Sequence, residues 1–235
     1  MIDFHSHILP KLDDGSKSSE MSLQMLQLSY AHGIDVMVAT PHFYIKHNTV
    51  DRFIGSRDAS YKALVKRINE SGADVPEIIL GAEVYYFGNI ASLPELERLC
   101  IGTTRYLLLE LPFEEWTQKI ITDCEKLVYD CKIIPVIAHL DRYLTYQKHN
   151  NYIQELMNMG AVIQMNGEYI NGILTRRKAL ALIKSGVVSL LGSDCHNMGK
   201  RSPNLDKTFK IILDKCGQET LSRIDRCGRE ILKGK

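Results

Sequence analysis

Residues 2–7 read IDFHSH, a short apolar run that ends in two histidines one residue apart. Residues i and i+2 of an extended strand point to the same side, so the imidazoles of His5 and His7 can face one ion. A similar pattern lies near the other end of the chain, where residues 187–193, VVSLLGS, lead into Asp194 and His196. We therefore expect two strands whose carboxyl ends carry metal-binding side chains.

Further apolar runs lie between these two, over residues 35–40, 77–83, 106–111, 133–139 and 161–165. They are rich in Val, Ile and Leu and mostly lack alternation, as expected of strands that are buried on both faces of a parallel sheet. Amphipathic stretches separate them, over residues 18–32, 50–70, 116–130, 147–159 and 174–185. This alternation predicts βαβ units, in either a closed barrel or a doubly wound sheet.

Almost every predicted strand leads into a side chain that can bind a metal. In chain order these are His5 and His7, His42, Glu83, Glu110, His139, Asn166, and Asp194 with His196. A parallel barrel converges the carboxyl ends of its strands on one active-site face, whereas an open sheet spreads them along an edge. The pattern therefore favours a single-domain, seven-stranded parallel barrel over residues 1–235.

Eight of these groups carry imidazole or carboxylate, which suit manganese, iron, zinc or magnesium. They are too many for one ion, and clusters of two or three ions typically hydrolyse phosphoesters. A buried salt bridge is the alternative for Glu83 and Glu110, and a hydrogen-bonded core histidine is the alternative for His42 and His139. Asp14, in the sequence Asp13-Asp14-Gly15, is on the residues alone as readily a turn residue as a ligand.

Two arginines follow the predicted ligands closely: Arg142 is three residues after His139, and Arg201 is five after His196. A guanidinium fork matches the geometry of phosphate, although a plain surface position is the alternative. Aromatic residues occur in the same loops. They either form an apolar rim for an aromatic leaving group or close the mouth of the barrel: Phe43, Tyr44, Tyr85, Tyr86, Phe113, Trp116 and Tyr143.

The overall composition excludes several classes of protein. Hydrophobic residues make up 45% of the 235 residues, and the net charge is +1, so a large core is expected and nucleic acid is not. No apolar run approaches the roughly 20 residues that span a bilayer, and the opening lacks the pattern of a signal peptide. The six cysteines show no C-x-x-C pairing. We expect free thiols in a cytoplasmic protein that does not insert into membranes.

The motifs, taken in order, resemble the polymerase and histidinol phosphatase (PHP) family over about residues 2–203. They are IDFHSHILPKLDDG, TPHF, GAEVYY, LLLEL, AHLDRY, MNG and SDCHN. More narrowly, the chain looks like the PHP-type protein-tyrosine phosphatases of bacterial capsule and exopolysaccharide synthesis. The resemblance implies a distorted (β/α)7, TIM-like barrel with three metal ions, commonly manganese. It implies a phosphotyrosine protein as substrate, chiefly a tyrosine autokinase that controls polysaccharide export.

The same resemblance implies a distribution of the ligands. One site would use His5, His7, Glu83 and Asp194; a second would share Glu83 with Glu110 and His139; a third would use Asp14, His42 and His196. Arg142 and Arg201 match the family's phosphate-holding arginines, and we expect Tyr44 and Tyr86 beside the substrate. The chain departs from the family at Lys11, where Gly is expected, and at Asp141, where Glu is expected; Lys11 bears on the loop that carries Asp14.

Other enzyme classes fit less well. Cys195 and Arg201 have the C-x5-R spacing of cysteine-dependent phosphatases, but that loop has His before the Cys and Gly three residues after it. An amidohydrolase has a histidine where this chain has Asn166, and a metal nuclease has a basic surface. A non-catalytic module need not keep the full ligand set. Within the family, a phosphatase of histidinol phosphate or another small phosphomonoester remains the alternative.

Overall fold

The computed structural model describes residues 1–147 and 151–234. The strands of these parts are β1 (Ile2–Ser6), β2 (Val36–Ala39), β3 (His42–Phe43), β4 (Glu77–Leu80), β5 (Glu83–Tyr85), β6 (Tyr106–Glu110), β7 (Ile134–Ile137), β8 (Val162–Asn166) and β9 (Leu190–Gly192). All pairings between them are parallel. They form one sheet in the order β1-β2-β4 and another in the order β3-β5-β6-β7-β8-β9. The prediction of a parallel α/β fold is confirmed.

The sequence predicts seven strands, whereas the described residues form nine shorter ones. The run 77–83 is divided into β4 and β5 at Gly81, where an added Cβ would lie 3.3 Å from a side-chain carbon of Ile101. β2 ends before Pro41, which has no N–H to continue the ladder, and β3 follows. β1 and β9 meet through a hydrogen bond from the amide of His7 to the carbonyl of Cys195, 2.9 Å long.

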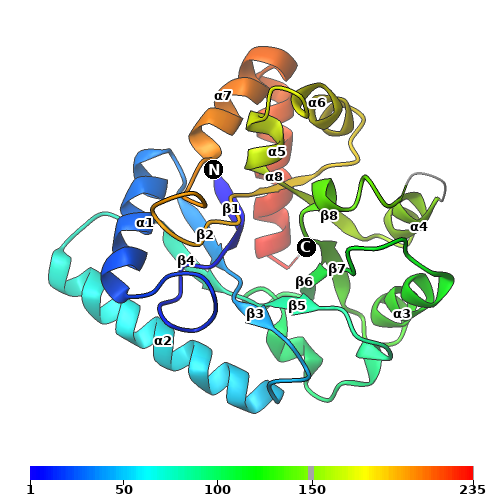
Figure 1. Cartoon of the computed structure of the whole chain (residues 1–235), viewed down its shortest axis with the longest axis horizontal. Coiled ribbons are helices and arrows are strands. Elements are labelled where there is room, and N and C mark those ends of the chain that lie inside the picture. The colour runs from blue at the N-terminus through cyan, green and yellow to red at the C-terminus, as the bar shows by residue number, and fades with distance from the viewer. Residues whose placement is uncertain (148–150, 235) are drawn as a thin grey trace.

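The helices lie around the strands, which occupy the middle of the molecule in Figure 1. They are α1 (Ser19–Ala31), α2 (Val50–Ser71), α3 (Gln118–Tyr129), α4 (Tyr152–Asn158), α5 (Gly167–Asn171), α6 (Arg176–Lys184), α7 (Leu205–Cys216) and α8 (Gln218–Leu232), with short 3-10 turns at Ile90–Ser92, Leu96–Leu99 and Leu140–Arg142. The expected helices did not include α5, α7 and α8, and residues 148–150 of the predicted helix 147–159 lie outside the described residues. Within the described chain, no helix combines the length and apolar character needed to cross a bilayer.

A small apolar cluster connects the strands beneath the polar residues. It contains Ile2, Phe4, Val36, Val38, Leu108, Val136 and Leu190 of the strands together with Ile231 of α8. Gly228 lets α8 approach β1, because a Cβ there would lie 2.5 Å from the Phe4 ring. Glu110 is two residues beyond Leu108 and therefore points to the same side of β6. The predicted ligand Glu110 thus lies at the carboxyl end of β6, on the side of the strand that carries this apolar cluster.

Candidate metal centre

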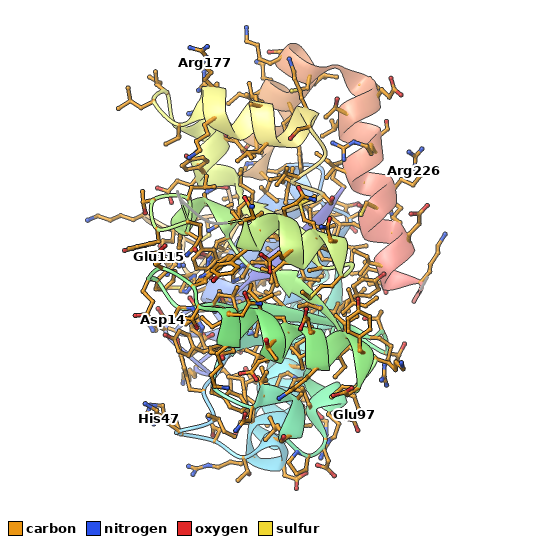
Figure 2. The ribbon with its side chains drawn as sticks, turned by 90° about the vertical axis from the view of Figure 1, so that its right-hand side faces the viewer. Asp14, His47, Glu97, Glu115, Arg177 and Arg226 are labelled. Atoms are coloured by element: carbon orange, nitrogen blue, oxygen red, sulfur yellow. The ribbon has the colours of Figure 1, made fainter. Side chains whose placement is uncertain are left out.

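The loops that follow the carboxyl ends of the strands gather on one side of the molecule. Figure 2 shows Asp14, after β1, along the same side as His47, after β3, and Glu115, after β6. Glu97 and Arg226 lie on the opposite side. The predicted ligands therefore belong to the side of the fold on which parallel barrels place their active sites.

The first group of ligands is His5, His7, Glu83 and Asp194, all buried. Glu83 Oε2 lies 3.2 Å from His5 Nε2 and 3.3 Å from His7 Nε2, and the two imidazole nitrogens are 3.1 Å apart. Asp194 Oδ1 is 3.6 Å from His5 Nε2 and 3.5 Å from His7 Nε2. Both histidines of the H-x-H pair thus face one point between two carboxylates, as predicted.

Glu83 joins this group to the ligands on the neighbouring strands. Its Oε1 lies 2.9 Å from His139 Nε2, and its Oε2 lies 2.9 Å from His42 Nδ1. Glu110 Oε1 is 3.3 Å from the same nitrogen of His139. One buried carboxylate therefore touches four of the predicted histidine ligands, which is the position of a bridging group.

The third group extends to the surface. Asp14 Oδ1 lies 3.3 Å from His196 Nε2 and 3.5 Å from His42 Nε2. Its side chain is 62% exposed, so it stands at the mouth of the cluster. All nine predicted ligand residues are therefore brought together, and three overlapping sets of ligand atoms lie within 4.8 Å of one another: His7, Asp14, His42 and His196; His5, His7 and Glu83; and His42, Glu83 and Glu110.

The loop that carries Asp14 closes at Lys11, where the resemblance led us to expect glycine. Lys11 has a φ of 60°, in the left-handed region that favours glycine. Its amide donates to the carbonyl of Ser16 at 2.8 Å, and the amide of Ser16 donates to the carbonyl of His7 at 3.0 Å. Lys11 thus adopts a backbone conformation that glycine favours, and Asp14 reaches His42 and His196.

The chemistry of these donors fits bound divalent cations. Neighbouring ligand atoms about 3 Å apart suit an ion that they approach to about 2.1 Å. Among the described residues, the buried His196 Nε2 has no hydrogen-bond partner. Burial raises the pKa of Glu83, but attraction to His5 and hydrogen bonds with His139 and His42 outweigh it and hold that pKa well below its ordinary value. The carboxylate is therefore ionised, as a metal ligand must be.

Asp13 is a site residue that the sequence reasoning missed. Its Oδ2 lies 2.7 Å from His7 Nδ1 and accepts a hydrogen bond of 3.1 Å from the amide of His42. Its Oδ1 accepts from the amide of Gly15 at 2.9 Å. A carboxylate on one ring nitrogen fixes the tautomer of a ligating histidine and directs the other nitrogen to the metal. The D-D-G sequence contained this signal, but only Asp14 was read as a ligand.

The two predicted arginines meet at one carboxylate. Arg142 Nη2 lies 2.5 Å from Asp194 Oδ2, and Arg201 Nη2 lies 2.7 Å from Asp194 Oδ1. Their side chains are 37% and 36% exposed, so each guanidinium presents further N–H groups to the mouth of the cluster. This arrangement can hold an anion next to the ligands.

The aromatic residues divide between the two roles that the sequence left open. Phe43, Trp116 and Tyr143 are buried in the apolar core. Tyr44 and Phe113 are exposed, 36% and 42%, and their rings lie 5.3 Å from His42 and 5.8 Å from His139.

Tyr44, Tyr85 and Tyr86 line a pocket of about 530 Å³ beside the cluster. The Tyr86 hydroxyl donates to Asp123 Oδ2 at 2.7 Å, which turns that end of the ring toward α3. Tyr86 therefore offers the pocket its ring, while its hydroxyl is already engaged.

The sequence matches a family model described as capsular polysaccharide synthesis, CpsB/CapC, over residues 1–231. The chain belongs to the CpsB/CapC family. It is 30% identical over 228 residues to tyrosine-protein phosphatase CpsB of Streptococcus pneumoniae, which covers 92% of this chain and 91% of that relative. It is 28% identical over 235 residues to tyrosine-protein phosphatase CpsB of Streptococcus agalactiae serotype III (strain NEM316), covering 95% of this chain and 94% of the relative.

The fold of this CpsB/CapC protein is similar to that of a solved relative. The match is to crystal structures of YwqE from Bacillus subtilis and CpsB from Streptococcus pneumoniae, described as unique metal-dependent tyrosine phosphatases. It has a TM-score of 0.88 at 24% identity and covers 100% of this chain and 95% of the other. The parallel α/β architecture is thus shared along the whole chain.

Proposed function

We propose that this CpsB/CapC protein is a metal-dependent protein-tyrosine phosphatase formed by a single domain over residues 1–235. The observation that carries the proposal is the convergence of nine histidine and carboxylate residues, with Glu83 at their centre and two arginines at the mouth. Its relatives of similar length are named tyrosine-protein phosphatases. We also propose that β2 with β3, and β4 with β5, act as single barrel strands, which would give the distorted (β/α)7 arrangement.

Two or three manganese ions are the cofactor we propose for the cluster. His5, His7, Glu83 and Asp194 would hold one ion, Glu83 with Glu110 and His139 a second, and Asp14, His42 and His196 a third. When bound, such ions lower the pKa of water and stabilise charge on the attacking and leaving oxygens of a phosphoester.

The protein's own groups would bind and orient the substrate. The further N–H groups of Arg142 and Arg201 would donate to the phosphoryl oxygens, and Asp14 Oδ2 lies 3.9 Å from Arg201 Nη1 at the mouth. The rings of Tyr44 and Tyr86 would contact the substrate from the pocket side. The leaving phenolate has a pKa near 10, so its departure requires less proton donation than that of an alkoxide.

The physiological substrate we propose is a phosphotyrosine protein, namely a bacterial tyrosine autokinase that controls capsular polysaccharide synthesis. We propose that the two proteins meet in the cytoplasm. A substrate panel tests this proposal. We expect a phosphotyrosine peptide to be hydrolysed with a higher kcat/KM than a phosphoserine peptide or histidinol phosphate. A preference for histidinol phosphate would instead support the small-molecule phosphatase, and equal rates on both peptides would contradict the role of the aromatic rim.

Replacing Cys195 with serine is expected to leave most of the activity intact. Cys195 is fully buried within the large apolar core, between two residues whose side chains face the cluster. Burial also raises the pKa of its thiol well above the ordinary value, which opposes formation of a nucleophilic thiolate. We would measure kcat/KM and metal content of Cys195→Ser. Complete loss of activity at unchanged metal content and stability would favour a cysteine mechanism.

A further inference from the structure

β8 differs from its neighbours because it supplies no ligand to the cluster, although it lies between β7 and β9. It carries instead two buried amides, Gln164 and Asn166, 0% and 5% exposed. Residues i and i+2 of a strand share one side, so both side chains point the same way. A buried primary amide needs hydrogen-bond partners for its donors and its acceptor. Here the two amides bond to each other and to proposed metal ligands.

The direction of the hydrogen bonds along these amides is determined by one peptide group. The amide of His139 lies 2.6 Å from Gln164 Oε1, and a peptide N–H can only donate. Gln164 Nε2 must then face the other way, where it donates to Asn166 Oδ1 at 3.0 Å. Asn166 Nδ2 is left to donate to Asp194 Oδ2, also at 3.0 Å. The assignment of oxygen and nitrogen in both amides therefore follows from the backbone.

The same oxygen of Gln164 determines the orientation of a third ligand. It lies 3.4 Å from His5 Nδ1 and, as an acceptor, favours the tautomer with the proton on that nitrogen. His5 Nε2 then keeps its lone pair, and this atom lies 3.2 Å from Glu83 Oε2 inside the cluster. A ligating histidine ordinarily donates its second N–H to such an acceptor.

Two of these ligands have backbones that need external support. His139 and Asp194 have φ values of 31° and 52°, in the left-handed region that side chains rarely adopt. Gln164 accepts from the amide of the first, and Asn166 donates to the carboxylate of the second. Gly192 of β9 pairs with Asn166, and a Cβ added there would lie 2.6 Å from Gln164 Nε2 and 2.5 Å from the Cβ of His5. The space is thus shaped to hold this amide against His5.

We propose that Gln164 and Asn166 are positioning residues that act as one amide relay, holding His5, His139 and Asp194 in their metal-binding orientation. The inference rests on the proposed metal-dependent function. It adds a role for β8 that does not involve ligation. Because the relay acts through the ligands, its loss is expected to weaken metal binding in a folded protein rather than substrate binding.

Manganese binding to metal-stripped protein tests the relay directly, by titration with detection of free Mn²⁺. We expect Gln164→Leu and Asn166→Leu each to weaken manganese binding by about 10–100-fold. The double variant should lose no more than the stronger single one, because both residues serve one chain of hydrogen bonds. At saturating manganese, KM for a phosphotyrosine peptide should be unchanged and kcat should return toward the wild-type value.

Gln147→Leu is the matched control. Gln147 is also a buried glutamine, and it bridges two backbone groups, donating to the carbonyl of Glu114 at 2.8 Å and accepting from the amide of Trp116 at 3.2 Å. Its loss should lower the thermal midpoint without changing manganese affinity. Unchanged affinity in both β8 variants, or fully additive losses, would overturn the relay. Failure of the wild-type protein to bind manganese or another divalent metal would instead contradict the proposed function.

A measurement on the wild-type protein keeps the inference testable if the variants do not fold. With diamagnetic Zn²⁺ or Mg²⁺ bound, the His5 Nδ1–H proton should give an NMR signal that is protected from exchange with water, because Gln164 accepts it in a buried site. An Nδ1–H of His5 that exchanges freely with solvent would contradict the relay.

Discussion

Replacing Glu83 with glutamine is expected to lower kcat/KM for a phosphotyrosine peptide by at least about 1,000-fold, equivalent to roughly 4 kcal/mol of transition-state stabilisation. The Glu83 carboxylate lies within 3.3 Å of His5, His7, His42 and His139, so it belongs to more than one ligand group. An amide has one oxygen and an NH₂ group, and it cannot bridge two cations. Bound metal should therefore fall together with activity.

Glu97→Gln is the control for this change, because Glu97 is exposed on the opposite side of the molecule (Figure 2). It should retain wild-type activity and metal content. Circular dichroism should show that Glu83→Gln is folded, since the apolar core is intact. A folded Glu83→Gln protein with wild-type metal content and kcat/KM would refute a bridging role for this residue.

Replacing Arg142 or Arg201 with alanine is expected to cost on the order of 1.5–3 kcal/mol of transition-state stabilisation, about 10- to 150-fold in kcat/KM. Each guanidinium donates to one oxygen of Asp194 and is about a third exposed, so it has further N–H groups that can donate to phosphoryl oxygens; Arg201 Nη1 also lies 3.9 Å from Asp14 Oδ2. Because each oxygen of Asp194 has its own arginine, loss of one arginine leaves the other hydrogen bond in place. Metal content should therefore be close to that of the wild type.

The control is Arg226→Ala, since Arg226 lies on the opposite side of the molecule in Figure 2 and is exposed. Arg226→Ala should leave kcat/KM unchanged. Because it removes the same charge as the other two variants, it shows whether the loss depends on where the arginine lies or only on net charge. If Arg142→Ala and Arg201→Ala both hydrolysed the peptide as fast as the wild type, the assignment of phosphate binding to these arginines would be wrong.

Eight of the nine ligands could be predicted from the residues alone because each follows a recognisable apolar strand, whereas Asp14 is assigned only from the family resemblance. His5 and His7 are one residue apart at the end of IDF, and in a parallel fold the ends of such strands meet on one face. That rule brought together Glu83, Glu110 and His139 from segments far apart in the chain. It needed only the order of strands and not their lengths.

What the sequence could not reveal depends on tertiary contacts. Asp13 has the appearance of a turn residue, and only the folded loop shows it against His7 and the amide of His42. Gln164 lies inside an apolar run, and its role depends on a peptide group from β7. The apolar run 77–83 likewise reads as one strand, whereas the structure divides it into β4 and β5 on either side of Gly81.

The central claim is that hydrolysis of phosphotyrosine depends on several metal ions in the Glu83 cluster, and one measurement tests it most directly. The metal ions bound to the purified protein are counted by elemental analysis. The protein is then stripped with a chelator, and its hydrolysis of a phosphotyrosine peptide is measured before and after manganese is added back. The account predicts more than one ion per chain, loss of activity on stripping and recovery with manganese. One ion or none, with hydrolysis intact in excess chelator, would contradict it.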